Sequence, residues 1–188
     1  MEVRVENTSI EAVKIISHQV FEDERGFFME AYRKEDFEKL GLPTNFVQVN
    51  HSRSAKNVVR GLHFQWEPPM GKMMRVTLGE AFLVAVDVRK GSPTLGQWVG
   101  EFISADNKKQ MWAPAGFARG FAVTTEFAEV QYMTTGQYNG NCESGILWND
   151  PEIGIEWPVS EPILSEKDVK SQALAEWLDH PDSNNFLY

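Results

Sequence analysis

The sequence predicts an all-β fold, an antiparallel sandwich or barrel, and three observations favour it. Short runs of alternating or β-branched residues recur about ten times, at intervals of roughly 8–12 residues, as strands do in such folds. Glycine, proline or asparagine stands between most of these runs. Helical periodicity is scarce in a chain of 188 residues that contains 12 Phe and 6 Trp. A chain of this length can bury a full core, so we expect one domain over residues 1–188.

The expected strands follow from the period-2 pattern and from the turn residues that bound each run. In chain order they are residues 13–16, 27–32, 46–50, 58–65, 72–78, 81–88, 97–103, 110–113, 119–124 and 127–135. Residues 23–26 (DERG) form the first turn, and Gly79-Glu80 predicts a hairpin between the runs 72–78 and 81–88. Residues 34–40 have helical character, and Gly41 ends that helix.

The C-terminal tail is the second segment with helical character, from about residue 165 to 178. Ser165 is the expected N-cap, and an i, i+4 stripe follows it at Val169, Ala173 and Trp177. Residues 180–188 carry several turn-forming residues, so we expect them to be loosely held.

Composition and charge narrow the class of function. The net charge is −9, from 18 basic and 27 acidic residues, which argues against nucleic acid or an anionic membrane as a partner. The chain has neither an apolar run of membrane-spanning length nor the pattern of a secretory signal, and a single cysteine, Cys142, cannot form an internal disulfide. These features predict a cytoplasmic protein. A small anionic ligand remains compatible with the charge, because a pocket depends on its own side chains.

Residues 58–65 (VVRGLHFQ) carry the strongest local signal for a site. This strand places a fixed cation, a group that titrates near neutral pH and an amide within six positions, at Arg60, His63 and Gln65. Strict alternation sends Arg60 and His63 to opposite faces, so both reach one cavity only if a bulge at Gly61 redirects one of them. The alternative is a core histidine satisfied by a backbone carbonyl, with Arg60 at the rim. Spacing alone leaves the two readings about even.

Other chemistries find no support in the pattern. The four histidines stand in unrelated contexts and give no cluster of three ligands, so we expect no metal site. No Gly-x-Ser-x-Gly elbow and no glycine-rich phosphate loop occur, and Cys142 lies in a polar turn. Acid–base chemistry is what remains.

The candidate acid–base groups each have an ordinary explanation as well. Asp168 can fix the tautomer of a histidine, but Ser165 to Asp168 also fits a capping box, and this reading is the stronger one on its own. Tyr132 alternates with apolar residues, which is typical of a core tyrosine. Three cations near turns or strand starts are ordinarily solvated charges: Arg25, Arg60 and Lys72.

Taken together, these residues belong to stretches that run in one order from about residue 10 to 170. They are residues 23–30 (DERGFFME), 46–50 (FVQVN), 60–65 (RGLHFQ), 86–89 (VDVR), 92–94 (SPT), 114–118 (PAGFA), 148–151 (WNDP), 153–158 (IGIEWP) and 163–168 (ILSEKD). In these stretches the chain resembles the dTDP-4-dehydrorhamnose 3,5-epimerase family, whose members are cupin-type jelly rolls that act on nucleotide-linked 4-keto-6-deoxy sugars. The resemblance implies a cupin-type antiparallel jelly-roll barrel with short peripheral helices, and an isomerase.

The resemblance also implies a role for each matching position. His63 is similar to the general base, Asp168 to the residue that orients it, and Tyr132 to the acid that returns a proton to the opposite face of the sugar. Lys72 resembles the group beside the C4 oxygen. The positions that match substrate-binding residues are Arg25, Phe27, Glu30, Gln48, Asn50, Arg60, Arg119 and Tyr138. The family implies a homodimer with exchanged N-terminal strands, a nucleotide-diphosphate sugar as substrate, and neither metal nor organic cofactor.

Three positions depart from the family pattern. Leu83 stands where relatives usually have Asp, Arg119 where they usually have His, and Val169 where they usually have Arg. The first two changes alter the charge of the sugar pocket by about two units. They leave open which sugar and nucleotide are used, and whether one or both carbons are inverted. A single-centre epimerase and a non-catalytic sugar-nucleotide-binding barrel are the alternatives.

Overall fold

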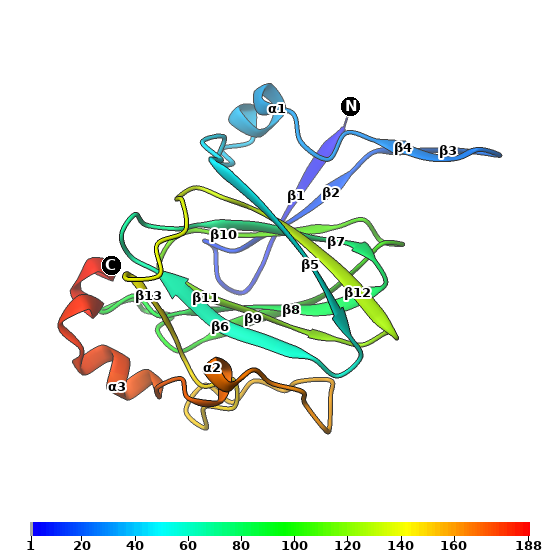
Figure 1. Ribbon diagram of the computed structural model, residues 1–188. Coiled ribbons are helices and arrows are strands. Elements are labelled where there is room, and N and C mark those ends of the chain that lie inside the picture. The colour runs from blue at the N-terminus through cyan, green and yellow to red at the C-terminus, as the bar shows by residue number, and fades with distance from the viewer. Residues whose placement is uncertain (1) are drawn as a thin grey trace.

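Two antiparallel sheets form the body of the protein in the computed structural model, which describes residues 2–188 (Figure 1). The six-stranded sheet has the order β1 (Val3–Asn7), β2 (Lys14–His18), β10 (Gln110–Ala113), β7 (Lys72–Leu78), β12 (Phe127–Thr134) and β5 (Gln48–Ala55). The five-stranded sheet has the order β13 (Glu143–Gly145), β6 (Val59–Gln65), β11 (Phe117–Val123), β8 (Glu80–Asp87) and β9 (Trp98–Ser104). The expected antiparallel all-β fold is confirmed, and the strand order within each sheet is that of a chain crossing repeatedly between two layers.

The main core lies between the two sheets. Met74 and Val130 extend from the six-stranded sheet, and Leu83, Ala85 and Phe121 meet them from the five-stranded sheet in one buried cluster. Burial of these side chains from water is the largest stabilising contribution to such a sandwich.

The predicted hairpin between residues 72–78 and 81–88 is wrong. Strand β7 pairs with β10 and β12, whereas β8 pairs with β11 and β9, so the chain changes sheets at Gly79. Gly79 has φ +67°, and a Cβ there would lie 2.0 Å from the carbonyl oxygen of Phe127. Met74 and Val76 of β7 instead share one buried cluster with Leu83 and Ala85 of β8, so the two runs meet across the core and not side by side in one sheet.

A two-stranded hairpin, β3 (Val20–Asp23) and β4 (Gly26–Met29), projects from the body beside the N-terminal strands (Figure 1). The sequence predicted its turn and its second strand, but extended that strand to residue 32. Its three phenylalanines, Phe21, Phe27 and Phe28, are between 48% and 61% exposed. The expected helix follows as α1 (Lys34–Lys39), anchored by the buried Phe37.

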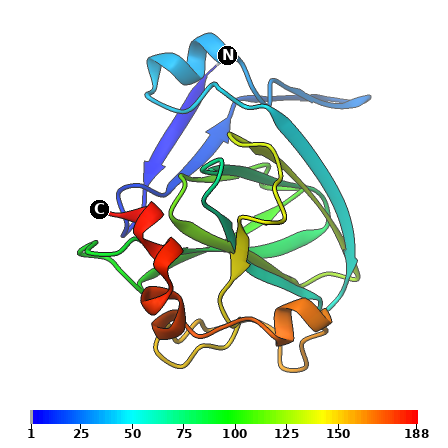
Figure 2. The same cartoon turned by 60° about the vertical axis from the view of Figure 1, so that its left-hand side comes forward.

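The C-terminal tail differs from the single helix that we expected. It forms α2 (Glu166–Val169), α3 (Leu174–Asp179) and a 3-10 turn (Pro181–Phe186), which lie along one side of the barrel (Figure 2). The predicted stripe is broken, since Val169 is exposed and Trp177 is buried. The expectation of a loose end is also wrong, because Phe186 is buried against Phe64 and Trp177 and its carbonyl accepts the backbone N–H of Lys90 at 2.8 Å.

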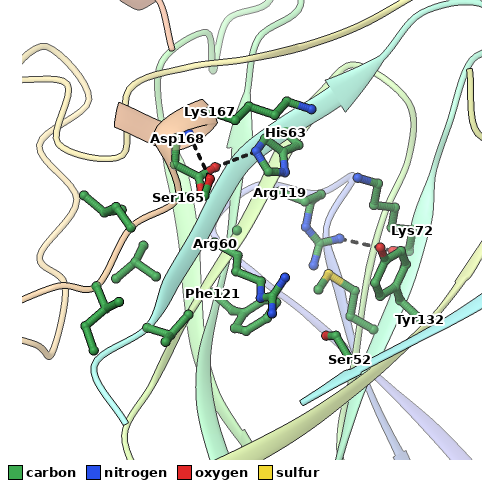
Figure 3. A pocket seen from close by; sticks show the side chains of 16 residues that line it. Ser52, Arg60, His63, Lys72, Arg119, Phe121, Tyr132, Ser165, Lys167 and Asp168 are labelled. Carbon is green, nitrogen blue, oxygen red and sulfur yellow. Dashed lines mark hydrogen bonds and ion pairs between the residues drawn. The ribbon is translucent and has the colours of Figure 1, made fainter. Parts of the chain in front are cut away.

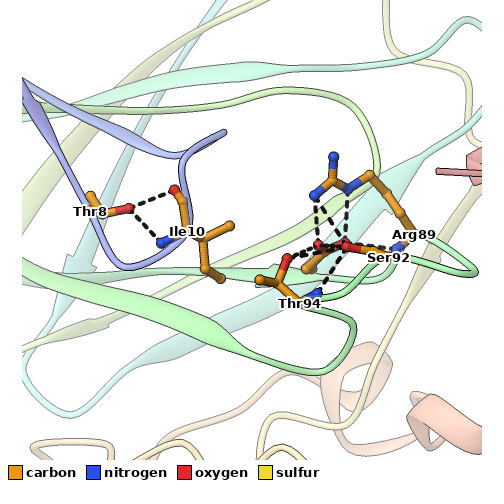
Figure 4. A network of polar contacts seen from close by, with 6 residues as sticks. Thr8, Ile10, Arg89, Ser92 and Thr94 are labelled. Carbon is orange, nitrogen blue, oxygen red and sulfur yellow. Dashed lines mark hydrogen bonds and ion pairs between the residues drawn. The ribbon is translucent and has the colours of Figure 1, made fainter.

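A buried carboxylate organises the turn after β8 (Figure 4). Asp87 accepts two hydrogen bonds from the Arg89 side chain, at 2.9 and 2.7 Å, and one each from the hydroxyls of Ser92 and Thr94 at 2.6 Å. Burial alone would raise the pKa of Asp87, but these hydrogen bonds outweigh it and lower the pKa below its ordinary value. Because this hydrogen-bond network stabilises the turn, a structural role is sufficient to explain why residues 86–89 and 92–94 resemble the family.

Candidate active site

A cavity of about 470 Å³ lies between the two sheets, with α2 at one side (Figure 3). Both sheets and the segment before α2 contribute to its wall. The residues that line it are Ser52, Val58, Val59, Arg60, His63, Lys72, Met74, Arg119, Gly120, Phe121, Tyr132, Ile163, Leu164, Ser165, Lys167 and Asp168. Six of the twelve residues predicted from the sequence are therefore in one place: Arg60, His63, Lys72, Arg119, Tyr132 and Asp168.

A bulge in β6 brings Arg60 and His63 to the same cavity. His63 is opposite Arg119 and Arg60 is opposite Phe121, so β6 advances three residues while β11 advances two. The irregularity falls at Gly61, which has φ +124° and comes so close to β11 that a Cβ would lie 2.7 Å from the carbonyl oxygen of Arg119. Only glycine fits there. The predicted bulge is confirmed.

His63 and Asp168 form a hydrogen-bonded pair. The distance from His63 Nε2 to Asp168 Oδ1 is 2.7 Å, and Asp168 Oδ2 accepts the Ser165 hydroxyl at 2.7 Å. Burial would raise the pKa of Asp168, but the hydrogen bonds from His63, Ser165 and the Gly61 N–H outweigh it, so the pKa lies below its ordinary value. An ionised Asp168 holds the proton on Nε2 and leaves the Nδ1 lone pair of His63 for chemistry.

The expected capping box is half formed, with Ser165 as the N-cap but no hydrogen bond from the Ser165 backbone N–H to the Asp168 carboxylate. The backbone N–H of Asp168 donates to Ser165 Oγ at 3.1 Å, as an N-cap predicts. The cap uses the backbone of Asp168 and the pair with His63 uses its carboxylate, so one residue satisfies both readings.

Tyr132 and Lys72 reach the cavity from the opposite sheet. They lie on the neighbouring strands β12 and β7, and the Lys72 ammonium is 5.9 Å from the centroid of the Tyr132 ring. The ring of Tyr132 packs against the core cluster, as an ordinary core tyrosine does, while the residue also lines the cavity. Burial raises the pKa of Tyr132, so its phenol stays protonated at neutral pH.

The cavity is cationic although the chain as a whole is acidic. Four cationic side chains and one carboxylate line it. Burial lowers the pKa of Lys72 to about 8, and the nearby Arg119 adds to this shift. A group of this kind suits an anionic ligand, because low-dielectric walls strengthen the attraction. Leu83 is not among the residues that line the cavity, and it is fully buried in the apolar core cluster.

Three more of the predicted residues form a hydrogen-bonded group on β5 and the loop after β12. Gln48 donates to Asn50 at 2.9 Å and accepts the backbone N–H of Tyr138 at 3.0 Å. The Tyr138 hydroxyl donates to Glu143 at 3.0 Å. Asn50 is the cross-strand neighbour of Tyr132, which places this group next to the cavity without lining it.

The last three predicted residues are separated from the cavity of their own chain. Arg25 and Phe27 are on the projecting hairpin, where Arg25 pairs with Asp23. Glu30 follows the hairpin and pairs with Arg33. None of the three contributes to the wall of the cavity.

Comparison with known proteins agrees with this architecture. Residues 7–176 match the family model for dTDP-4-dehydrorhamnose 3,5-epimerase. A protein of that name from Pseudomonas aeruginosa is 54% identical over 170 residues, which cover 89% of this chain and 94% of the relative.

The chain belongs to the dTDP-4-dehydrorhamnose 3,5-epimerase family.

Solved structures of the family share this jelly-roll fold closely. The dTDP-6-deoxy-D-glucose-3,5-epimerase of Legionella pneumophila, in complex with dTDP-4-keto-L-rhamnose, has a TM-score of 0.92 and 42% identity, with 99% of this chain and 98% of the other covered. ChmJ of Streptomyces bikiniensis, a 3'-monoepimerase in complex with dTDP-quinovose, has a TM-score of 0.86 and 32% identity, with 91% and 88% covered. The enzyme is thus an isomerase-class epimerase.

Two charged residues at the site of this epimerase were not predicted from the sequence. Glu143 and Lys167 form an ion pair of 2.6 Å beside the cavity, and Lys167 lines it. Glu143 lies on a three-residue strand with no readable pattern, so its place depends wholly on the fold. Lys167 precedes Asp168, and that adjacency was the one available signal.

Among residues 2–188, none of the helices combines the length and the apolar character that crossing a lipid bilayer requires.

Proposed function

We propose that this chain inverts C3 and C5 of a dTDP-linked 4-keto-6-deoxyhexose, with His63 as the base and Tyr132 as the acid. The observation that carries the proposal is the placement of these two groups on facing sheets across one cationic cavity. The C4 ketone acidifies the hydrogens on C3 and C5, so a neutral imidazole is a strong enough base. The single cysteine fits a cytoplasmic enzyme.

Each inversion consists of two proton transfers. Nδ1 of His63 takes the proton from carbon, and the electron pair of the broken C–H bond moves to the C4 oxygen as an enolate. The phenol of Tyr132 then gives a proton to the opposite face of the same carbon, and the electrons return to form the ketone. Lys72 stabilises the negative charge on oxygen in a site shielded from water. Each inversion leaves His63 protonated and Tyr132 deprotonated, and exchange of both groups with solvent restores them before the next inversion, so atoms and charge balance with no oxidant and no cofactor.

Solvent exchange tests this function directly. We expect incubation with dTDP-4-keto-6-deoxyglucose in heavy water to place deuterium at C5 and C3 and to yield the doubly inverted sugar, as read by NMR. Labelling of one carbon alone identifies a single-centre epimerase. Labelling of neither carbon, with dTDP still bound, identifies a binding barrel and rejects the proposal.

A single-centre epimerase is the second candidate, because two observations favour it. The chain is 35% identical to a dTDP-4-dehydrorhamnose 3-epimerase of Streptomyces niveus, and it shares its fold with the 3'-monoepimerase ChmJ. In addition, Arg119, which lines the cavity, departs from the pattern that the 3,5-epimerase family usually has. The pattern of labelling in the same experiment decides between the two candidates.

The pH profile gives a prediction for Lys72. Its pKa is about 8 because of burial, with Arg119 and Lys167 lowering it further and Glu143 opposing them. The ammonium is charged below that pH and loses its charge above it, so kcat/KM should fall about tenfold per unit as the pH rises past 8. The raised pKa of Tyr132 keeps that phenol out of this range. Lys72→Arg should move the fall to higher pH, and an unchanged profile for this variant would contradict the assignment.

We also propose that the enzyme is a homodimer in which the hairpin of one subunit completes the cavity of the other. A two-stranded hairpin is marginally stable alone, and this one exposes phenylalanine on both faces, with Phe21 and Phe28 paired on one and Phe27 on the other, which a partner would cover. Arg25 and Phe27 then reach the nucleotide end of the partner's cavity. The isologous contact that this requires closes as a dimer with two equal sites.

Complementation between two defective subunits tests this assembly. His63→Ala removes the base of its own cavity, and Arg25→Ala removes the residue offered to the other cavity. In a mixture of equal amounts, exchanged by mild denaturation and refolding, mixed dimers hold one intact site, so about a quarter of the wild-type rate should return. No recovery in a mixture shown to contain mixed dimers would mean that Arg25 acts within its own chain, or not at all.

A further inference from the structure

Arg119 is the most deeply buried charged group in the wall of the cavity that has no charged partner. Its side chain is 3% exposed. Nε donates to the carbonyl oxygen of Val84 at 3.1 Å, and Nη1 donates to the carbonyl oxygen of Lys72 at 3.1 Å. These two bonds join a strand of each sheet through one guanidinium and fix its plane.

The remaining nitrogen of Arg119 has no partner. Nη2 is buried and makes no hydrogen bond within residues 2–188, and no carboxylate of those residues pairs with the guanidinium. A guanidinium has five N–H donors in a rigid fork, and a buried polar group without a partner costs free energy. Burial lowers the pKa of Arg119 to about 9, which still leaves it charged at neutral pH. The structure therefore holds a fixed cation with unfilled donors.

The position of Arg119 places these donors among the reacting groups. Arg119 is the cross-strand neighbour of His63, and its guanidinium lies between His63 and the pair Lys72 and Tyr132 (Figure 3). Arg60 is an exposed cation of the same wall, and the resemblance assigns it to the substrate's diphosphate. Arg119 lines the cavity with Nη2 just beneath the wall, so a ring held between His63 and Tyr132 brings an oxygen of the sugar, rather than a phosphate, to the guanidinium, and a small shift of that group toward the ligand opens Nη2 to it.

We propose that Arg119 is a catalytic residue that donates hydrogen bonds from Nη2 to the C4 oxygen of the sugar, and that it shares with Lys72 the charge of the enolate. This inference rests on the proposed function. The proton still moves from carbon to His63, and the electron pair still moves to oxygen. Arg119 forms no bond and transfers no proton. Its contribution grows as the oxygen becomes negative, which is the condition for lowering the barrier.

The test compares Arg119→Gln with wild type and with Arg53→Gln, which makes the same substitution at an exposed guanidinium on β5. We expect Arg119→Gln to slow deuterium incorporation about 10²–10³-fold, the usual loss for one oxyanion donor. The Kd for dTDP should stay within about threefold, since the nucleotide is held elsewhere. A purely structural role would lower thermal stability and dTDP affinity without slowing exchange selectively. Arg53→Gln should match wild type.

A second readout separates electrostatics from packing. Since the charge of Arg119 lowers the pKa of Lys72, its removal should move the alkaline fall of the rate upward from about pH 8. If Arg119→Gln does not fold, Arg119→His carries the test. The ratio of its rate to the wild-type rate should fall as the pH rises through roughly 6.5, where an imidazole loses its charge.

Wild-type enzyme in the same assay keeps the two claims apart. If wild type labels no carbon, the proposed function fails. If wild type is active and Arg119→Gln exchanges at the wild-type rate, or if the ratio for Arg119→His is constant with pH, the role of Arg119 is wrong and the proposed function stands.

Discussion

His63→Ala is expected to abolish deuterium exchange at both C3 and C5, with a fall in kcat/KM of roughly 10³-fold or more, toward the upper end for a general base. In the proposed mechanism one imidazole serves both carbons, and Nδ1 of His63 is the nitrogen left free once Nε2 is bound to Asp168 at 2.7 Å. The fold should survive, since the core is apolar and independent of this ring. NMR in heavy water measures the loss at each carbon separately.

The matched control for this variant is His51→Ala. His51 is an exposed histidine on β5 that pairs with Glu129 at 3.0 Å and does not line the cavity. Its removal should leave both exchange rates unchanged. Exchange at near-normal rate in His63→Ala, with dTDP binding intact, would show that another group removes the protons.

Local sequence patterns predicted the bulge that builds the site, for a definite physical reason. Arg60 and His63 are three residues apart, and a strand with period 2 cannot aim both at one face unless an extra residue intervenes. Gly61 is the residue type that permits it. The sequence alone shows that two polar side chains three residues apart cannot share one face of a regular strand. The bulge in β6 brings them to one cavity, as predicted.

The pairing of strands could not be predicted in the same way. Residues 72–78 and 80–87 are adjacent in sequence and each has an apolar face, which fits a hairpin as well as two strands on opposite sheets. The choice depends on partners far along the chain, β10 and β12 for one and β9 and β11 for the other. The prediction for the C-terminal tail was wrong for the same reason. Phe186 and Trp177 pack against Phe64, which lies more than 100 residues earlier in the chain.

The site itself was predicted through the resemblance, and geometry adds what a pattern cannot. Asp168 had two competing explanations, which the fold makes compatible by using its backbone for the cap and its carboxylate for His63. The unfilled donors of Arg119 are invisible in sequence, because they depend on which carbonyls lie nearby. Arg25 lies outside the cavity of its own chain, because its hairpin points away from the body.

Tyr132→Phe is expected to separate proton removal from inversion. The base on the other sheet still takes the proton, so deuterium should enter the sugar within about tenfold of the wild-type rate. Without the phenol, the enolate has no donor on its second face and recovers deuterium from the side of His63. Labelled substrate of unchanged configuration should therefore accumulate, and the yield of inverted product should fall about 10²–10³-fold.

The raised pKa of Tyr132 makes this separation sharp, because the phenol is fully protonated over the range in which the enzyme is assayed and acts as a donor only.

Tyr32→Phe is the matched control. The Tyr32 hydroxyl donates to the backbone carbonyl of Thr44 at 3.3 Å and lies outside the cavity, so the ratio of inverted to retained product should not change. A wild-type ratio in Tyr132→Phe would assign the second proton to another group. Lys72 is then the first to test, because it lines the cavity on the same sheet and its ammonium is 5.9 Å from the centre of the Tyr132 ring.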